Sequence, residues 1–339
     1  MSYRLRHGEA DTRDIRRIFR AHVEDAQAML TARRISDGAV HETRRLLKNA
    51  RATLRLIRDA MSTAQYRHEN EGLRDVGRPL SAWRDARILI DTLDNLASDL
   101  DSDSEQGAAA ALRQILQRER RHAARSASNG SEGLALSRIM LRLERARIGR
   151  APVEAGGWRA IRRGLKRVYS KGRSGFGSAR FCAKAMRRSA GRTAVTQPRG
   201  GAQLPPGQLQ LSVQLSLQLH EWRKQVKYLL HQLRLFEPLW PGPIGKLADQ
   251  AHVLSGYLGD DHDLAMLRQK ALEHRDILAG AAGATALLAR IDHRRERLQG
   301  KALRLGARLY DEKPAPFVSR IGKYWKRWQR ESDRVTGDG

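Results

Sequence analysis

The chain has 339 residues, and its 64 Lys or Arg against 37 Asp or Glu give a formal net charge of +27 at pH 7. This length allows two domains that each bury a core, and the charge favours a polyanionic partner. A single cysteine, Cys182, excludes an intramolecular disulfide framework, and no apolar run reaches the roughly 18 residues that a membrane span needs.

Apolar residues recur at helical spacing from the start of the chain, and they predict a first amphipathic helix over 11–33. Ser36-Asp37-Gly38 then breaks the chain and offers N-cap oxygens to a basic helix that contains His41. A third helical region begins near Ser62 and continues to about Leu100. Pro79 interrupts it, because proline fixes φ and has no backbone N–H.

A loop is predicted over 99–107, where the chain is acidic and rich in small residues, and Asn129-Gly130 is a turn signal. Helices are predicted on either side of that turn, over 108–125 and 134–148. The segment after Arg150 contains Pro and Gly, and we place a boundary there. The predicted domains are residues 1–150 and residues 151–339.

The second half opens with a helix from Trp158 whose basic side carries Arg163 and Lys166. Gly and Pro then predict a flexible loop at about 190–208. The later predicted helices cover 209–236, 244–278, 284–309 and 316–330. In the last of them, Trp325 and its aromatic neighbours are interpreted first as core anchors and second as a membrane-surface face. Because every predicted element is a helix, the expected fold class is all-α.

The helix that begins near His41 has one cationic face and one apolar face. Positions 41, 44, 48, 51, 55 and 58 alternate in steps of three and four, so they share a face about 25 Å long. A parallel apolar stripe contains Leu47, Ala50, Leu54 and Ile57. The pattern predicts that the charge is displayed on a surface, where a compensating anion offsets the repulsion between neighbouring cations.

A second helix repeats this pattern at a constant offset of 179 residues. His41-Glu-Thr-Arg-Arg-Leu-Leu-Lys48 corresponds to His220-Glu-Trp-Arg-Lys-Gln-Val-Lys227, and Arg55 corresponds to Arg234. A single basic helix is often a solvated face with no ligand. Its duplication favours a shared function of the two helices.

These paired helices resemble those of the CHAD family, the conserved histidine α-helical domain. A second pair agrees, since Leu80-Ser-Ala-Trp-Arg-Asp-Ala-Arg-Ile-Leu89 is similar to Leu258-Gly-Asp-Asp-His-Asp-Leu-Ala-Met-Leu267. The resemblance extends from about Asp11 to about Arg330. It implies two similar antiparallel helical bundles related by internal pseudo-twofold symmetry, which bind inorganic polyphosphate through basic residues near their interface.

The resulting hypothesis is non-catalytic binding of inorganic polyphosphate in a basic groove between two bundles, in a cytoplasmic protein that associates with polyphosphate granules. Arg grips phosphate oxygens with its planar fork of donors, and Lys adds mobile charge. Whether the two histidines contact the ligand or are structural stays open. The predicted polyphosphate-binding residues are His41, Arg44, Arg45, Lys48, Arg51, Arg55, Arg163, Lys166, His220, Arg223, Lys224, Lys227 and Arg234.

No catalytic residue, metal ligand or cofactor is predicted. Motifs for a phosphate loop, a zinc protease and a nucleophile elbow do not occur in the sequence. Asp260-Asp261-His262-Asp263 is the best candidate for a metal cluster. Consecutive residues on a helix point in different directions, so a hydrogen-bonding role at a helix end or between helices is favoured.

Two other functions remain as alternatives. Nucleic-acid binding also fits clustered Lys and Arg, but aromatic residues for base stacking make up only 5% of the chain. A polyphosphate-cleaving or triphosphate-cleaving enzyme is the less favoured alternative, because no general-base cluster accompanies the cations. The sequence does not predict an oligomeric state or a protein partner.

Overall fold

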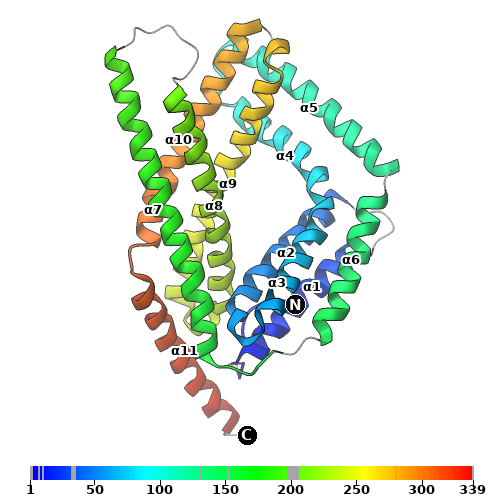
Figure 1. Cartoon of the computed structure of the whole chain (residues 1–339), viewed down its shortest axis with the longest axis vertical. Helices are drawn as coiled ribbons and strands as arrows, with labels where there is room; N and C mark the ends of the chain where they lie inside the picture. Colours follow the sequence, from blue (N-terminus) through cyan, green and yellow to red (C-terminus); the bar gives the residue numbers. More distant parts are fainter. Residues whose placement is uncertain are drawn as a thin grey trace.

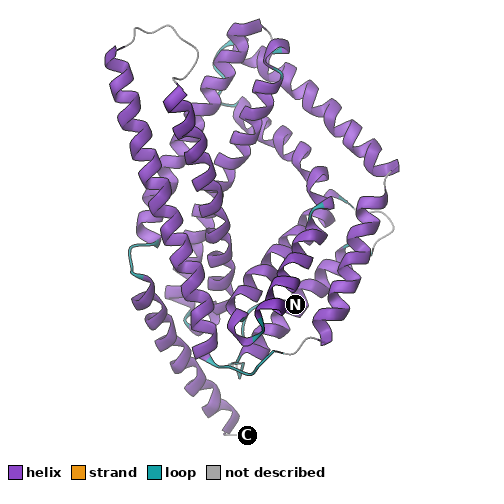
Figure 2. Ribbon diagram, in the orientation of Figure 1, coloured by secondary structure: helices purple, strands orange, loops and turns teal. Residues whose placement is uncertain are grey.

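The computed structural model of the protein describes residues 3–6, 8–9, 11–31, 36–129, 131–150, 153–196, 206–278 and 280–337. Within these ranges every regular element is a helix and none is a strand (Figure 2). The all-α fold class is therefore confirmed. No helix in the same ranges combines the length and the apolar character that spanning a bilayer requires.

The first half of the described chain forms six α-helices. They are α1 (Thr12–Met29), α2 (Asp37–Leu56), α3 (Thr63–Gly77), α4 (Pro79–Ala97), α5 (Asp103–Asn129) and α6 (Ser131–Arg150), with the 3-10 helix η1 (Arg58–Ala60) after α2. Ser36 caps α2 as expected, since its hydroxyl accepts the N–H of Ala39 at 3.2 Å. Pro79 begins α4 at a position where a missing N–H costs nothing.

The second half of the described chain forms five α-helices, and the first four of them are longer than any helix of the first half. They are α7 (Trp158–Thr196), α8 (Pro206–Phe236), α9 (Pro241–Glu273), α10 (Gly280–Leu309) and α11 (Pro314–Gly337), with the 3-10 helices η2 (Glu237–Leu239) and η3 (Arg275–Ile277). Both ends of the loop predicted over 190–208 are therefore helical, because α7 continues to Thr196 and α8 begins at Pro206. Residues 197–205, the middle of that loop, lie outside the described residues.

The loop predicted over 99–107 is shorter than expected, because α5 already begins at Asp103. A capping box explains this early start. The Ser102 hydroxyl accepts the N–H of Glu105 at 3.3 Å, and the Glu105 carboxylate accepts the N–H of Ser102 at 3.1 Å. The acidic composition that suggested a loop is thus partly the signature of a helix N-terminus.

Among the described residues three hydrophobic clusters hold the helices together, and two of them combine both halves of the chain. One cluster lies within the first half, around Phe19, Leu54 and Leu141. A second unites α7 to α11 with residues of α1 and α2, including Ile18 and Leu56. The third packs α4 and α5 against α9 and α10. Figure 1 shows the result: the long helices α7 to α10 stand beside the group α1, α2, α3 and α6, and α4 and α5 reach across at one end.

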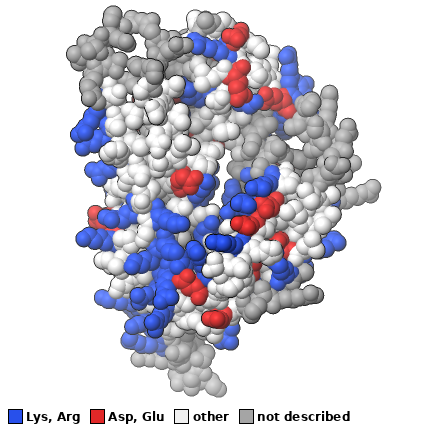
Figure 3. Space-filling view, in the orientation of Figure 1, with Lys and Arg blue, Asp and Glu red and all other residues white. Residues whose placement is uncertain are grey.

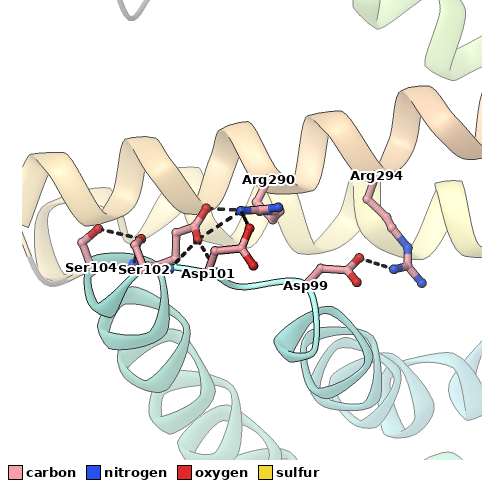
Figure 4. Close-up of polar contacts among 7 residues, drawn as sticks. Asp99, Asp101, Ser102, Ser104, Arg290 and Arg294 are labelled. Atoms are coloured by element: carbon pink, nitrogen blue, oxygen red, sulfur yellow. Dashed lines mark hydrogen bonds and ion pairs between the residues drawn. The ribbon is translucent and has the colours of Figure 1, made fainter.

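The link through α4 and α5 is also polar. In the loop between these helices, Asp101 accepts a hydrogen bond at 2.6 Å from Arg290 of α10, and Asp99 pairs with Arg294 one turn further along (Figure 4). Glu105, at the start of α5, lies 3.2 Å from Arg290. The short loop therefore fixes the far ends of the two halves to each other.

The aromatic residues of α11 are core anchors, as predicted. Trp325 is fully buried and Trp328 is 3% exposed. The Trp325 ring lies 5.4 Å from the ring of Trp158 at the start of α7 and 6.0 Å from that of Phe236 at the end of α8. These contacts pack α11 against the start of α7 and the end of α8.

Candidate polyanion-binding site

The two faces of α2 are divided as the sequence pattern predicts. Leu47, Ala50, Leu54 and Ile57 are at most 3% exposed and belong to the core. On the other side His41, Arg45 and Lys48 are exposed, and Arg44, Arg51 and Arg55 are half-buried. The cationic face is shorter than predicted, because α2 ends at Leu56 and Arg58 lies in η1.

The duplicated helices α2 and α8 meet directly. The hydroxyl oxygen of Thr53 lies 2.9 Å from Nε2 of His231, and the side-chain amide of Gln232 donates to the carbonyl of Ala52 at 3.1 Å. At the offset of 179 residues, Ala52 corresponds to His231 and Thr53 to Gln232. Thr53 therefore contacts the counterpart of Ala52, and Ala52 contacts the counterpart of Thr53.

Beyond this contact, cations from α2 gather around polar groups of α3 and α8. Arg51 and Arg55 both donate to the side-chain oxygen of Asn70, at 3.1 and 3.2 Å. The Arg55 guanidinium lies over the ring of Tyr228, 4.0 Å from its centroid. Burial lowers the pKa of Arg51, and the nearby charges of Arg55 and Arg74 lower it further. A bound anion would relieve that unfavourable environment.

The long helix α7 brings two more predicted cations to this place. A Cβ on Gly164 would lie 2.4 Å from the carbonyl oxygen of Leu56 and 2.5 Å from that of Arg55, so only glycine allows α7 to lie this close to the end of α2. Arg163 and Lys166 flank this glycine and are exposed. Figure 3 shows Lys and Arg side chains gathered over α2, α7 and α8 on one face of the molecule.

Several of the predicted residues already have carboxylate partners. Arg45 pairs with Glu42 in α2, and the equivalent Lys224 pairs with Glu221 at 2.7 Å in α8. Arg234 is bound by Asp249 of α9 at 2.6 Å. By contrast, within the described residues no carboxylate forms an ion pair with Arg51, Arg55, Arg163 or Lys166. These four cations of α2 and α7 therefore have no carboxylate partner among the described residues.

The paired arginines of the repeat reach from their helices toward the next helix in each half. Arg44 donates to the carbonyl of Gly77 at the end of α3, at 3.1 Å. Arg223 approaches α9, where its guanidinium would lie 3.8 Å from a Cβ on Gly259. Lys48 and Lys227 follow one turn later on the same faces, exposed and half-buried respectively.

The two histidines of the repeat have different surroundings. His41 is exposed, whereas His220 is half-buried and stacks on His262 with ring centroids 5.0 Å apart. Burial, together with the charge of Lys224, lowers the pKa of His220. The neutral form of His220 is therefore favoured, and its stacking on His262 gives it a structural role beside any contact with a ligand.

The acidic segment at Asp260 has the interhelical role that the sequence favoured. Asp261 is 3% exposed and accepts hydrogen bonds from Arg295 at 3.1 Å and from Gln299 at 2.8 Å, both on α10. The carboxylate of Asp263 lies 3.0 Å from Nδ1 of His262. In the part of the chain that the structure describes, no group of three or more His, Cys, Asp or Glu is placed to hold a metal ion.

Sequence reasoning missed the residues that hold the cations in position. Asn70, which accepts hydrogen bonds from Arg51 and Arg55, lies on α3, a helix without any repeated motif, so no local signal marks it. Tyr228 directly follows Lys227 of the second motif, and that position is its only signal. Whether these residues and the predicted ones bind a ligand stays a prediction.

The family assignment agrees with this geometry. A family model described as the CHAD domain matches residues 17–272, so the chain belongs to the CHAD domain family. The match ends in the last turn of α9, and α10 and α11 lie beyond it. This is a shorter extent than the motif resemblance suggested.

Two solved structures are similar to the chain. PptA from Streptomyces chartreusis has 16% sequence identity and a TM-score of 0.57, over 88% of this chain and 99% of that one. The CHAD domain from the plant Ricinus communis has 13% identity and a TM-score of 0.42, over 88% of this chain and 89% of that one. The likeness to PptA shows a shared fold and nothing more. Comparison with curated proteins gives no match.

Proposed function

We propose that the protein binds inorganic polyphosphate along the surface where α2, α7 and α8 meet. The observation that carries this proposal is that Arg51 and Arg55 of α2, and Arg163 and Lys166 beside the contact of α7 with α2 at Gly164, form no ion pair with a carboxylate among the described residues. A linear polyanion supplies a negative charge at every repeat unit, which suits a row of cations contributed by three helices. A small phosphate compound reaches only a few of them.

The proposed arrangement of the halves is an internal pseudo-twofold. The reciprocal contacts at Ala52, Thr53, His231 and Gln232 support it, because a twofold axis pairs each residue with the counterpart of its neighbour. The equivalent ion pairs in α2 and α8 support it as well. On this proposal a polyphosphate chain crosses the axis and contacts both copies of the motif.

Binding without catalysis is part of the proposal. The carboxylates of Asp261 and Asp263 make hydrogen bonds to neighbouring side chains, so they are held in structural positions. The protein would then act by attaching itself to long polyphosphate, in the cytoplasm and on polyphosphate granules.

Single-stranded nucleic acid is the competing ligand. The accessibility of aromatic rings near the cations distinguishes it from polyphosphate. Base stacking needs an accessible ring face. The Tyr228 ring is covered by the Arg55 guanidinium and the Tyr66 ring by that of Arg58, at 4.0 and 4.8 Å from the centroids. Two aromatic side chains nearest the cations therefore already have a face occupied, which favours a ligand without bases.

A competition titration tests this choice. Labelled long-chain polyphosphate bound to the purified protein is displaced with unlabelled polyphosphate, single-stranded DNA or RNA at equal phosphate concentration and equal salt. The proposal predicts that polyphosphate displaces the label at the lowest concentration. Equal or better displacement by DNA or RNA would contradict it.

A further inference from the structure

The α7–α8 hairpin carries many positive charges and no negative charge over most of its length. Between Glu154 and Glu221 the sequence contains 13 Lys or Arg residues and no Asp or Glu. This segment includes all of α7 and the first half of α8. Near the end of α7, Arg180, Lys184, Arg187 and Arg188 are exposed, and none of them forms an ion pair within the described residues. They lie away from the surface proposed above, which uses the opposite end of α7.

At the same end of the hairpin, α8 exposes a stripe of apolar side chains. Leu209, Val213 and Leu217 are 51%, 54% and 57% exposed, and they follow each other at steps of four residues along one helix face. On α7, Phe181 is 76% exposed. The stripe arises because apolar residues occupy every second position from Leu209 onward, so a helix directs part of them away from the core.

The antiparallel packing of α7 and α8 places the exposed residues near the end of α7 and the apolar stripe of α8 at the same height along the hairpin. A Cβ on Gly175 would lie 3.2 Å from Cβ of Trp222, which fixes the register of the pair. Six residues further along α7 is Phe181, and five residues back along α8 is Leu217. Figure 3 shows mostly uncharged atoms over this end of the two helices, with Lys and Arg at the outer edge.

We propose that this end of the hairpin docks on an anionic phospholipid bilayer. The docking surface consists of Phe181, Lys184, Arg187, Arg188, Leu209, Val213 and Leu217. An anionic bilayer offers negative headgroups for the cations and an apolar layer for the four exposed side chains. Soluble polyphosphate would leave those apolar side chains in water, and a second copy of this surface would be repelled by its own charge.

Sedimentation with vesicles tests the proposal. The full-length protein is mixed with vesicles of phosphatidylcholine alone or of equal parts phosphatidylcholine and phosphatidylglycerol. We expect it to sediment with the mixed vesicles only. The variant F181S/V213S/L217S should lose at least about tenfold in vesicle affinity, because anchoring depends on the buried apolar area as well as on charge. Its melting temperature and its polyphosphate affinity should not change, since the replaced side chains are exposed.

A matched control changes three exposed apolar residues elsewhere. Met266, Leu272 and Ile277 are 45%, 38% and 66% exposed, and Leu272 and Ile277 are each adjacent in sequence to an acidic residue, Glu273 and Asp276. The variant M266S/L272S/I277S should sediment like the wild type. If F181S/V213S/L217S melts early, K184Q/R187Q/R188Q takes its place and should lose binding to the same degree. The proposal is overturned if the wild type stays in solution with mixed vesicles, or if the folded hairpin variant sediments as the wild type does.

Discussion

Thr53 of α2 touches His231 of α8 at the point where the two duplicated helices meet, with 2.9 Å between the hydroxyl oxygen and Nε2. His231 in turn lies 3.2 Å from Nε2 of His22, which is fully buried. The ring of Tyr3 stacks on His22 at 4.0 Å. A pair of imidazoles is therefore part of the contact between the halves.

The buried imidazoles of His22 and His231 predict that the free energy of unfolding decreases in acid. Burial, with a smaller contribution from His231 and from Arg45, lowers the pKa of His22 from 6.5 to about 2, and burial lowers that of His231 to about 3. Between these values and 6.5 the unfolded chain binds more protons than the folded one, so stability falls as pH falls through this window. Each histidine contributes at most about 1.4 kcal/mol per pH unit to the slope.

Unfolding by urea at several pH values between 7 and 4 measures this slope. The variant H22Q should show a shallower dependence than the wild type, because one of the two groups no longer titrates. An identical slope in both proteins would exclude His22 as a cause of acid instability.

The approach of α7 to α2 predicts contrasting effects of two glycine substitutions. G164A places a Cβ against backbone carbonyls of Arg55 and Leu56, which cannot easily move, and should lose about 1 to 3 kcal/mol of stability. G177A lies on the same helix with no atom near the new Cβ, and should gain about 0.5 to 1 kcal/mol. Urea unfolding of both variants checks this, and similar stabilities would contradict the close packing at Gly164.

The ion pairs within the two motifs predict a gain of affinity. Glu42 and Glu221 neutralise Arg45 and Lys224, so E42Q/E221Q should free both cations and raise polyphosphate affinity about two- to tenfold, as expected from the strength of exposed ion pairs. The control E312Q/E331Q removes the carboxylate partners of Arg320 and Arg327 near and on α11. Equal gains in the two double variants would show that only the net charge matters.

A linear ligand held by many charges should show a characteristic dependence on chain length and salt. We expect affinity to rise with polyphosphate chain length until the surface is filled and to fall steeply with added salt, by analogy with counterion release on nucleic acids. Titrations at several lengths and salt concentrations measure both. Orthophosphate or ATP binding as tightly as a long chain at equal salt would rule out a linear site.

Much of the fold was predictable because its signals are local. The caps at Ser36 and Ser62, the start of α4 at Pro79 and the apolar stripe of α2 all depend on neighbouring residues. The early start of α5 was missed although Ser102 and Glu105 form a capping box, because acidic composition was read as a loop. The extension of α7 to Thr196 was missed because glycine in one helix of 39 residues lowers helix propensity only locally.

The candidate site was predictable only in part, since spacing shows which residues share a face and not which residues meet across helices. Lys48 and Lys227 follow from the repeat. The carboxylate partner of Arg234 on α9 and the position of Asn70 beside Arg51 depend on tertiary packing. The glycine that brings α7 to the end of α2 has a meaning only once both helices are placed.

The central claim is that cations of α2, α7 and α8 bind polyphosphate, and the variant K48Q/R163Q/K166Q/K227Q tests it most directly. Arg44 is kept because it bonds to the carbonyl of Gly77. The control K313Q/K323Q/K326Q/R330Q removes the same number of cations, all of them exposed, from α11 and the residue before it, outside the family match. Both variants should melt like the wild type, whereas L54A, which empties a fully buried position, should lose about 2 to 5 kcal/mol.

The deciding measurement is a titration of both quadruple variants with long-chain polyphosphate at one salt concentration. The site variant should lose at least about 100-fold in affinity, given the strength of charge-assisted contacts and their non-additivity. The control should lose no more than about threefold, through the weaker overall field alone. A folded site variant that binds as the wild type does, or that loses no more than the control, would contradict the account.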